Sequence, residues 1–322
     1  MNFKTVAILT SGGDAPGMNA AIRAVVRSAA SKGIRPLGVR RGFNGLIYRD
    51  VFEMNIRSVS DIIERGGTIL YTARSPEFLT DKGLKKAVDN CARMNIDAIV
   101  VIGGDGSMRG AERLCKSGIN CICLPGTIDN DIACSEYSIG FDTAVNNAML
   151  MIDKIRDTAQ SHDRCNIIEV MGRRCGNIAV HTGMAVGATA ILIPEYKFNF
   201  QKDIIDRINF TQSIGKRHFI IIIAEGLRQT QKINEEIVRK IGIESRVTIL
   251  GHVQRGGSPS AKDRIAASEM GCLAVELLMS GENGKVIVVK NNRIIPIDIY
   301  AALKSKKLFD FNFYEKALEI SV

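Results

Sequence analysis

The sequence predicts an α/β protein made of two doubly wound domains with mainly parallel sheets. Apolar, strand-like runs alternate with helix-like segments along almost all of its 322 residues, which is typical of parallel sheets connected by helices. The strand-like runs are continuous in Val, Ile and Leu, so we expect both faces of each sheet to be covered. The chain is long enough for two domains, and ligands of such folds bind at the carboxyl ends of the strands.

Each expected strand is a short β-branched run that ends in turn residues, and each expected helix is a longer segment with periodic apolar positions. The expected strands are Val6–Leu9, Ala98–Ile102, Cys121–Leu124, Asn166–Met171, Ala190–Ile193, His218–Ala224, Val247–Leu250 and Lys285–Val289. The expected helices are Asn19–Lys32, Lys82–Met94, Ser107–Ser117, Asp142–Gln160, Lys202–Ile214 and Ala261–Met279.

The chain is expected to pass between the two domains more than once. One boundary is expected near Ser135–Gly140, and the turn-rich segment Gly251–Pro259 predicts a return crossing. We therefore expect one domain over 1–138 plus 252–305 and the other over 139–251 plus 306–322.

Composition is that of an ordinary globular protein, with 46% hydrophobic and 24% charged residues. No apolar run reaches the roughly 18 residues of a membrane span. The chain enters a strand soon after Met1, so no signal peptide is expected. These features predict a cytoplasmic protein.

The eight cysteines are scattered and contain no C-x-x-C pair. Cys121 and Cys123 alternate with apolar residues in one expected strand, which indicates packing. We interpret the cysteines as reduced, buried thiols, and a zinc or disulfide framework is the alternative.

The net charge of +9 is compatible with nucleic acid, a membrane surface or an anionic small molecule as partner. Basic residues are mostly interleaved with acidic ones, and the chain has no Trp and only 6% aromatic residues. Nucleic-acid stacking is therefore disfavoured, and arginines beside glycine motifs favour a phosphorylated small molecule.

Three expected strands end in turns that contain both glycine and aspartate. The first turn, Ser11–Gly17, is neither a P-loop nor a G-x-G-x-x-G fingerprint. A glycine turn that leads into a helix N-terminus can still bind an anion through its N–H groups. A plain β–α turn is the alternative interpretation.

The second turn is Gly103–Ser107, with the sequence GGDGS. Its glycines are expected to leave the backbone bare around Asp105, and Ser107 is expected to cap the next helix. This pattern favours a nucleotide polyphosphate, with Asp105 near its magnesium ion. The alternative is that Asp105 is only a turn residue.

The third turn is Pro125–Asp131, in which Asp129 and Asp131 are two positions apart. Two carboxylates on one short loop can divide the roles of base and metal or orienting group, and Thr127 adds a hydroxyl. An Asx-turn network is the alternative.

Arginines could stabilise a transferring phosphoryl group. Those near strand or loop ends are Arg74, Arg164, Arg173, Arg246 and Arg255. Arg255 shares one Gly-rich loop with His252, which favours joint anion binding by these two residues.

Taken together, these motifs resemble the bacterial ATP-dependent 6-phosphofructokinases. The resemblance runs from Val6 to about Met279 and rests on LTSGGDAPGMNAAIR, VVIGGDGS, LPGTIDNDI, EVMGR and LGHVQRGGSP in this order. GGDG alone also occurs in NAD kinases and lipid kinases, so the combination carries the resemblance.

The resemblance implies a glycolytic, allosteric kinase. Its first domain would bind ATP and Mg²⁺, and its second domain would bind fructose 6-phosphate. The γ-phosphoryl group would pass to the 1-hydroxyl, giving fructose 1,6-bisphosphate and ADP. A homotetramer with shared active sites is implied, because Arg164 and Arg246 match arginines that reach into a neighbouring subunit. Another sugar-phosphate kinase, for instance for tagatose 6-phosphate, an NAD kinase, and a non-catalytic nucleotide sensor are the alternatives.

The resemblance also implies roles for single residues. Asp129 matches the base, Arg173 matches a group that stabilises the phosphoryl, and Asp105 matches the metal ligand. Thr127 lies beside the base and completes the catalytic set. The implied ATP contacts are Gly13, Arg74, Ser75, Gly104, Asp105, Gly106 and Ser107. The implied sugar-phosphate contacts are Thr127, Ile128, Asp129, Arg164, Met171, Gly172, Arg173, Glu225, Arg246, His252, Val253, Gln254 and Arg255.

Two glycines favour ATP over pyrophosphate as the donor. Pyrophosphate-using relatives typically carry Asp at the position of Gly106 and Lys at the position of Gly126. Bulk at the first position would obstruct the nucleotide.

An effector site for ADP or phosphoenolpyruvate is implied, but with departures. The matching positions are Arg23, Arg27, Arg156, Lys216, Arg217 and His218. Ile56, Ile214 and Thr189 replace two cations and one carboxylate of the family pattern, so we expect reduced ADP activation. Arg174 also departs from the pattern, and the sequence assigns it no role.

Overall fold

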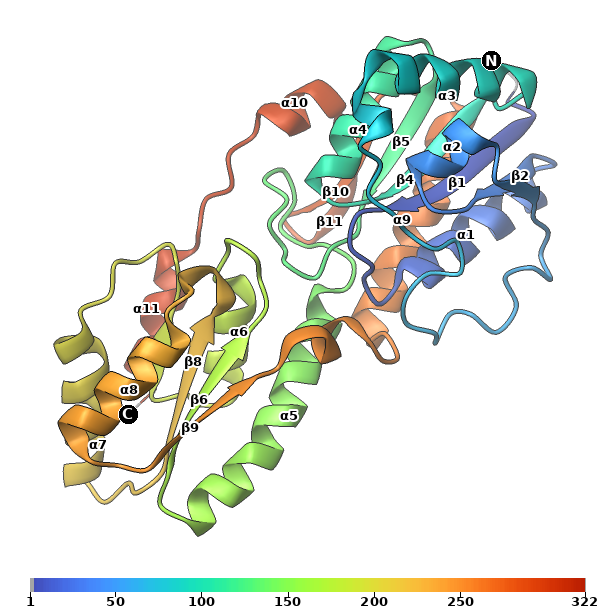
Figure 1. Cartoon of the computed structure of the whole chain (residues 1–322). Coiled ribbons are helices and arrows are strands. Elements are labelled where there is room, and N and C mark those ends of the chain that lie inside the picture. The colour runs from blue at the N-terminus through green and yellow to red at the C-terminus, as the bar shows by residue number, and fades with distance from the viewer. Residues whose placement is uncertain (1–2, 322) are drawn as a thin grey trace. The chain divides into compact units, whose positions relative to one another are not determined.

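The structure is a computed structural model that describes residues 3–321 (Figure 1). The chain divides into two compact units. Unit 1 comprises Met1–Ile128, Ile132–Thr143 and Arg255–Lys307, and unit 2 comprises Asp129–Asp131, Ala144–Gln254 and Leu308–Val322. The units therefore change at 143/144, 254/255 and 307/308, where the sequence suggested 138/139, 251/252 and 305/306, and the short segment 129–131 joins unit 2.

A seven-stranded sheet forms the centre of unit 1, in the order β11-β10-β5-β4-β1-β2-β3. Neighbouring strands from β10 to β2 are parallel, whereas β11 and β3 pair antiparallel at the edges. The strands are β1 (Thr5–Ser11), β2 (Arg35–Val39), β3 (Val51–Glu53), β4 (Ala98–Gly103), β5 (Asn120–Pro125), β10 (Lys285–Lys290) and β11 (Arg293–Asp298). Both β1 and β4 are buried along their whole length, as their apolar runs predict.

Helices cover both faces of this sheet (Figure 1). On one face α1 and α9 pack closely, because a Cβ on Gly271 would lie 2.7 Å from Ala24 Cβ. On the other face a core cluster includes the stacked rings of Phe43 and Phe78, whose centroids are 4.2 Å apart. The unit 1 helices are α1 (Met18–Ser31), α2 (Phe43–Tyr48), η1 (Glu77–Leu79), α3 (Asp81–Arg93), α4 (Asp105–Lys116), α9 (Ala261–Met279) and α10 (Ile299–Lys304).

Unit 2 has a four-stranded, fully parallel sheet in the order β7-β8-β6-β9. Its strands are β6 (Cys165–Val170), β7 (Ala190–Leu192), β8 (Phe219–Ala224) and β9 (Ser245–Ile249). The C-terminal helix packs onto this sheet, since the Tyr314 hydroxyl donates to the Ile191 carbonyl at 2.9 Å. The helices are α5 (Phe141–Ser161), which begins in unit 1, α6 (Asn177–Ala185), η2 (Gln201–Ile205), α7 (Asp206–Ser213), η3 (Glu225–Leu227), α8 (Thr230–Ile241), η4 (Gly251–Arg255), which ends in unit 1, and α11 (Phe311–Glu319).

Every expected strand and helix is present, with ends shifted by a few residues. The sequence did not predict β2, β3, β11, α2, α6, α8, α10 or α11. The expectation that all strands are buried is wrong for β9, which is an edge strand whose Ile249 is 65% exposed.

The cysteines are free thiols, but they are not all buried. Burial raises the pKa of Cys91, Cys165 and Cys175 to about 12, which keeps these thiols protonated and unreactive. Cys272 on α9 is exposed, contrary to expectation. No helix within residues 3–321 is long and apolar enough to cross a membrane.

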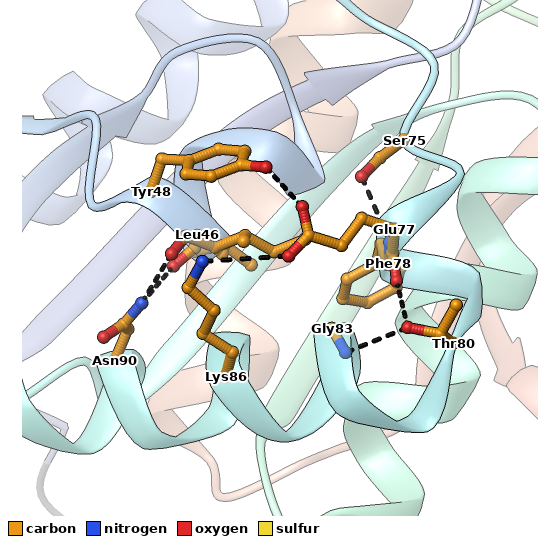
Figure 2. A network of polar contacts seen from close by, with 10 residues as sticks. Leu46, Tyr48, Ser75, Glu77, Phe78, Thr80, Gly83, Lys86 and Asn90 are labelled. Atoms are coloured by element: carbon orange, nitrogen blue, oxygen red, sulfur yellow. Dashed lines mark hydrogen bonds and ion pairs between the residues drawn. The ribbon is translucent and has the colours of Figure 1, made fainter.

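A buried amide joins α3 to the end of α2 (Figure 2). Asn90 is 4% exposed, and its Nδ2 donates to the carbonyl groups of Leu46 at 3.0 Å and Ile47 at 2.8 Å. These carbonyls lie in the last turn of a helix of six residues, where intrahelical donors are lacking. Asn90 therefore stabilises α2.

Asn90→Ala is expected to lower the free energy of unfolding by about 1–3 kcal/mol, because two buried carbonyl groups lose their donor. Urea-induced unfolding measures this change. Asp89→Ala, on an exposed position of the same helix, is the matched control and should change the value by less than about 0.5 kcal/mol. Equal effects of the two substitutions would contradict this role of Asn90.

Candidate functional site

The carboxyl ends of three neighbouring strands of unit 1 lie in one row. Ser11 of β1 is opposite Gly103 of β4, and Gly103 is opposite Pro125 of β5. The Gly126 N–H extends this pairing by donating to the Gly103 carbonyl at 3.0 Å. The register therefore brings all three glycine–aspartate turns to one edge of the sheet.

Gly103 lies at the closest contact between the first and second turns. A Cβ at this position would lie 2.4 Å from both Ser11 O and Ser107 Oγ. The Ser107 hydroxyl donates to the same Ser11 carbonyl at 2.9 Å. The expectation that Ser107 caps a helix is wrong, because α4 already begins at Asp105 with Gly104 as its N-cap. Ser107 instead ties the second turn to the first.

The second turn is open beyond Gly103. Within the described chain, a Cβ on Gly106 would meet nothing within 4 Å, and one on Gly104 would only touch Thr127 Cβ at 3.9 Å. Asp105 is 51% exposed at its side chain and pairs with Arg109 at 3.0 Å. The backbone is thus bare at Gly104 and Gly106, as expected. It is not bare at Gly103, so the expectation was wrong for this glycine. The N-terminus of α4 can accept an anion here.

The segment 68–76 is anchored to the first turn. The Thr72 hydroxyl donates to the Gly12 carbonyl at 2.6 Å. Ser75 Oγ accepts a backbone N–H of η1 at 3.3 Å, which fixes the end of the segment (Figure 2). Arg74 lies between these two attachments with an exposed side chain. The structure therefore places Arg74 and Ser75 on a segment joined to the first turn.

Arg255 also contacts the first turn. Its Nη1 donates to the Asp14 carbonyl at 2.9 Å and lies 2.7 Å from the position of a Cβ on Gly13. Gly13 therefore makes room for this guanidinium group. Arg255 belongs to unit 1 and His252 to unit 2, so joint anion binding by their loop stays a prediction.

The third turn is held by the chain that follows it. The Thr127 N–H donates to the Ile139 carbonyl at 3.1 Å, and the Thr127 carbonyl accepts from Ser138 Oγ at 2.7 Å. Asp129 is 6% exposed, and Asn130 has a left-handed φ of 47°. The Asn130 carbonyl accepts a side-chain hydrogen bond from α6 at 2.8 Å. Thr127 and the buried Ile128 thus belong to unit 1, and Asp129 to unit 2.

Unit 2 contains a cavity of about 670 Å³ whose lining residues are charged. The Arg173 N–H donates to Glu225 Oε1 at 2.6 Å. The two loops approach closely because Gly226 lacks a Cβ, which would lie 2.7 Å from the Arg173 carbonyl. Guanidinium groups and carboxylates on one wall suit a polar, phosphorylated ligand. The lining residues are Asp131, Glu169, Arg173, Arg174, Glu225 and Arg228.

Two further arginines share one carboxylate in unit 2. Arg164 and Arg246 pair with Glu244 at 2.9 and 2.8 Å. The hydrogen bond from Arg164, with a smaller one from Arg246, holds the pKa of Glu244 below its ordinary value. Two guanidinium groups at this spacing can together bind one phosphate group.

The residues after β6 are positioned by a buried glutamine. Gln254 is fully buried; its Oε1 accepts the Met171 N–H at 3.3 Å, and its Nε2 donates to the Gly251 carbonyl at 3.1 Å. Gln254 therefore supports Met171 in this structure. The next residue, Gly172, has a φ of 138° that favours glycine. Val253 beside Gln254 is 54% exposed.

The expected effector residues form two groups. Arg23 and Arg27 of α1 line a cavity of about 390 Å³ in unit 1. Arg156, Lys216 and His218 form a basic group in unit 2. Burial and the neighbouring Arg156 lower the pKa of both Lys216 and His218, and Lys216 adds to the effect on His218. Mutual repulsion among cations is typical of an anion site whose ligand would relieve it.

The departures from the effector pattern are visible in the structure. Ile56 and Ile214 are 54% and 63% exposed, so neither supplies charge nor packs in a core. Thr189 is buried, and within the described chain its hydroxyl has no hydrogen-bond partner. Arg217 pairs with Asp163 at 3.8 Å.

Sequence reasoning missed several lining residues. Glu169 and Arg228 face the unit 2 cavity, and Lys32 faces the unit 1 cavity beside Arg27. Arg228 lies three residues after Glu225, in the segment that follows the expected strand His218–Ala224, so the rule of strand ends could have found it. Glu169 lies inside β6 and not at a strand end, so the same rule does not find it.

Two mainly parallel α/β units, an open helix N-terminus at a row of strand ends and a charged cavity define an α/β phosphotransferase. The family model described as Phosphofructokinase matches residues 5–278. The chain therefore belongs to the phosphofructokinase family, and this confirms the fold class and the family resemblance expected from the sequence.

Single relatives agree with this assignment. The ATP-dependent 6-phosphofructokinase of Clostridium botulinum (strain Hall) is 52% identical over 319 residues, which cover 99% of this chain and 100% of that one. A structure of phosphofructokinase from Saccharomyces cerevisiae is similar with a TM-score of 0.87 at 33% identity; the match covers 99% of this chain and 48% of the yeast chain. A pyrophosphate-dependent phosphofructokinase from Marinobacter aquaeolei shares the fold, with a TM-score of 0.83, 20% identity, and coverage of 98% and 91%.

Gly103→Ala and Gly106→Ala are expected to change stability in opposite directions. The first places a Cβ against a backbone oxygen and should cost about 1–3 kcal/mol, as overpacking does. The second places Ala in open space within α4 and should stabilise by up to about 1 kcal/mol. Urea-induced unfolding measures both values, and calorimetric ATP titration should show weaker binding in both. A stable Gly103→Ala with unchanged ATP affinity would contradict this packing argument.

Proposed function

We propose that this chain transfers the γ-phosphoryl group of ATP to the 1-hydroxyl of fructose 6-phosphate in glycolysis, yielding fructose 1,6-bisphosphate and ADP. The observation that carries the proposal is the row of strand ends that joins the three glycine–aspartate turns at the open N-terminus of α4. This activity is the one expected from the sequence, and the curated relatives that match the chain over its length carry its name. The cytoplasmic location stays a prediction.

Unit 1 supplies the donor side of this reaction. The N–H groups at the start of α4 would bind phosphate oxygens, and the bare backbone at Gly104 and Gly106 allows their close approach. Arg74 and Ser75 would contact the nucleotide from the segment anchored to the first turn, together with Gly13 and Ser107. Prearranged donors of this kind stabilise the charge that spreads over the transferring group.

Magnesium fits the donor side as a companion of the nucleotide. Asp105 offers an exposed carboxylate at the phosphate turn, and Mg²⁺ is usually held by one or two carboxylates plus phosphate oxygens. Within residues 3–321, no group of three His, Cys, Asp or Glu side chains is placed to hold a metal ion. When bound, the ion would neutralise phosphate charge, and Asp105 would exchange Arg109 for it.

Unit 2 supplies the acceptor side. Asp129 would accept the proton of the 1-hydroxyl, with Thr127 and Asp131 beside it in sequence. Arg173, on the wall of the charged cavity, would stabilise the transferring phosphoryl group. Arg164 and Arg246 would hold the sugar phosphate, as their shared carboxylate supports. The remaining contacts to the sugar phosphate would come from Ile128 and Arg255 of unit 1 and from Met171, Gly172, Glu225, His252, Val253 and Gln254 of unit 2.

The donor preference for ATP follows from the space at two glycines. A side chain at Gly106 would extend into the open volume over the phosphate turn and compete with a nucleotide. A Cβ at Gly126 would lie 3.1 Å from Ile102 and 3.2 Å from Met18, so a lysine there would require these side chains to move.

A coupled assay of fructose 1,6-bisphosphate formation tests the proposal. We expect turnover with ATP and none with pyrophosphate. Asp129→Asn should lower kcat by about 10²–10⁴-fold, because a base contributes on this scale, and should leave ATP affinity unchanged. Near-normal turnover of this variant would reject Asp129 as the base.

An assay of ADP formation with other acceptors separates the alternatives. Preference for tagatose 6-phosphate or for NAD would indicate another kinase of related chemistry. ATP binding without turnover on any acceptor would indicate a nucleotide sensor.

The quaternary and regulatory parts of the proposal rest on exposed features. Strand β9 is an open edge with exposed Ile249 and with Arg246 64% exposed at its side chain, which supports a partner subunit there and a homotetramer with shared sites. ADP or phosphoenolpyruvate would bind the basic groups that contain Arg27 and Arg156.

ADP activation is expected to be weak, because Ile56, Ile214 and Thr189 supply no charge to the effector. We expect less than about a twofold gain in rate at sub-saturating fructose 6-phosphate, within a coupling energy below about 1 kcal/mol. Restoring one carboxylate with Thr189→Glu serves as the comparison. Strong activation of the unaltered protein would contradict the prediction.

A further inference from the structure

Asp263 is a fully buried carboxylate at the start of α9 that the proposed reaction does not use. It is 0% exposed. Its Oδ1 accepts from the Tyr137 hydroxyl and from the Gly140 N–H at 2.7 Å. Its Oδ2 accepts from the Thr143 N–H at 2.9 Å and from the Thr143 hydroxyl. Burial raises the pKa of Asp263 against the opposing effect of these hydrogen bonds.

The four donors to Asp263 share one feature, which is that they all belong to segment 137–143. An ionised carboxylate is tolerated in a protein interior only where fixed donors replace water. Asp263 itself lies in the first turn of α9, whose N-cap is Ser260 and whose dipole favours a negative charge. The carboxylate therefore fixes segment 137–143 to the end of a long helix.

Segment 137–143 in turn supports the third glycine–aspartate turn. The Ile139 N–H donates to the Pro125 carbonyl at 2.8 Å, and the Ile139 carbonyl accepts from the Thr127 N–H at 3.1 Å. Ser138 Oγ donates to the Thr127 carbonyl at 2.7 Å. Only Ile128 separates Thr127 from the proposed base, Asp129. A displacement of the segment would thus be transmitted along the backbone to the base.

The same segment contacts the first glycine–aspartate turn. A Cβ on Gly17 would lie 2.7 Å from Ile139 Cγ2 and 3.4 Å from Asp263 Cβ. A Cβ on Gly140 would lie 2.6 Å from Ala15 Cβ. Two of the three turns therefore pack against the chain that Asp263 holds.

We propose that Asp263 is a positioning residue for phosphoryl transfer, which fixes the backbone at Thr127 and thereby the base without touching substrate. This inference rests on the proposed function. The general reason is that reaction rates depend steeply on geometry: a misplacement of about 1 Å can cost roughly 10²-fold.

The test compares Asp263→Asn with Ser260→Ala. The asparagine keeps the shape but presents an N–H₂ group to donors, so we expect kcat to fall by about 10²-fold while the KM for ATP stays within about threefold, since the α4 N-terminus is intact. Ser260→Ala removes the N-cap hydroxyl, which accepts the Asp263 N–H at 3.3 Å. It keeps the Ser260 N–H that donates to Thr143 Oγ1 at 2.9 Å, and it keeps all four donors to the Asp263 carboxylate. This variant should lower the urea midpoint and leave kcat unchanged. Turnover is expressed per ATP-binding site, counted by calorimetry.

Hydrogen exchange supplies a readout that does not depend on activity. Asp263→Asn should speed exchange of the Thr127, Ile139 and Gly140 amides, and Ser260→Ala should not. Faster exchange with unchanged kcat would overturn the proposal, as would equal exchange in both variants. A wild-type protein without turnover would refute the proposed function alone and leave the exchange result to judge the link between Asp263 and Thr127.

Tyr137→Phe is a second, milder variant that tests the same contact if Asp263→Asn does not fold. It removes one of four donors, so it should lower kcat by a smaller factor with the same unchanged KM for ATP. In a folded double variant, the loss should not exceed that of Asp263→Asn alone, because both act through one contact. Unchanged kcat in Tyr137→Phe, or additive losses in the double variant, would overturn the proposal.

Discussion

The register of three parallel strands is the constraint on which the donor side depends. Hydrogen bonding between β1, β4 and β5 places Ser11, Gly103 and Pro125 in one row, so the following turns must begin at the same level. Gly103 lies in the middle, where a Cβ would overlap the Ser11 carbonyl. The missing Cβ lets Ser107 reach that carbonyl and set the direction of α4. A shift of one strand by one residue relative to its neighbours would move its turn out of the row. It would also point the strand's buried side chains to the opposite face of the sheet.

The proposed catalytic residues lie on loops next to these strand ends. The hydrogen bonds of the sheet do not hold these loops, so they need support from side chains. The third turn obtains it from segment 137–143 through Thr127, and that segment obtains it from Asp263. In unit 2, Gln254 holds Met171, and Glu225 holds the N–H of Arg173. Asp263 and Gln254 are fully buried and have several fixed partners, whereas Glu225 is half-buried. Such groups lock loop geometry because any displacement would leave a buried polar atom unpaired.

The sequence predicted those parts of the fold whose local signal agrees with the final packing. Runs such as Ala98–Ile102 are apolar throughout and are buried throughout. The strand Arg35–Val39 was missed because Pro36 and Gly38 weaken its strand signal; Gly38 is required since a Cβ would lie 2.7 Å from Met54 Sδ. Ser107 was misplaced because the glycine turn itself starts the helix. The exposure of β9 could not be foreseen, because sheet order decides which strand is an edge.

For the candidate site, the sequence revealed motifs made of consecutive residues. It did not reveal contacts between residues that are distant in the sequence. The three turns were found because each is a short segment, whereas Asp263 is more than a hundred positions from Tyr137 in sequence, and only the fold joins them. The fold likewise brings Arg156 next to Lys216 and His218, which are distant from it in sequence. Burial, and then repulsion from Arg156, lowers the pKa values of Lys216 and His218, and Lys216 adds to the effect on His218. A bound anion would raise these pKa values, so its affinity should increase as pH falls toward the lowered pKa of the free His218 and should level off below it.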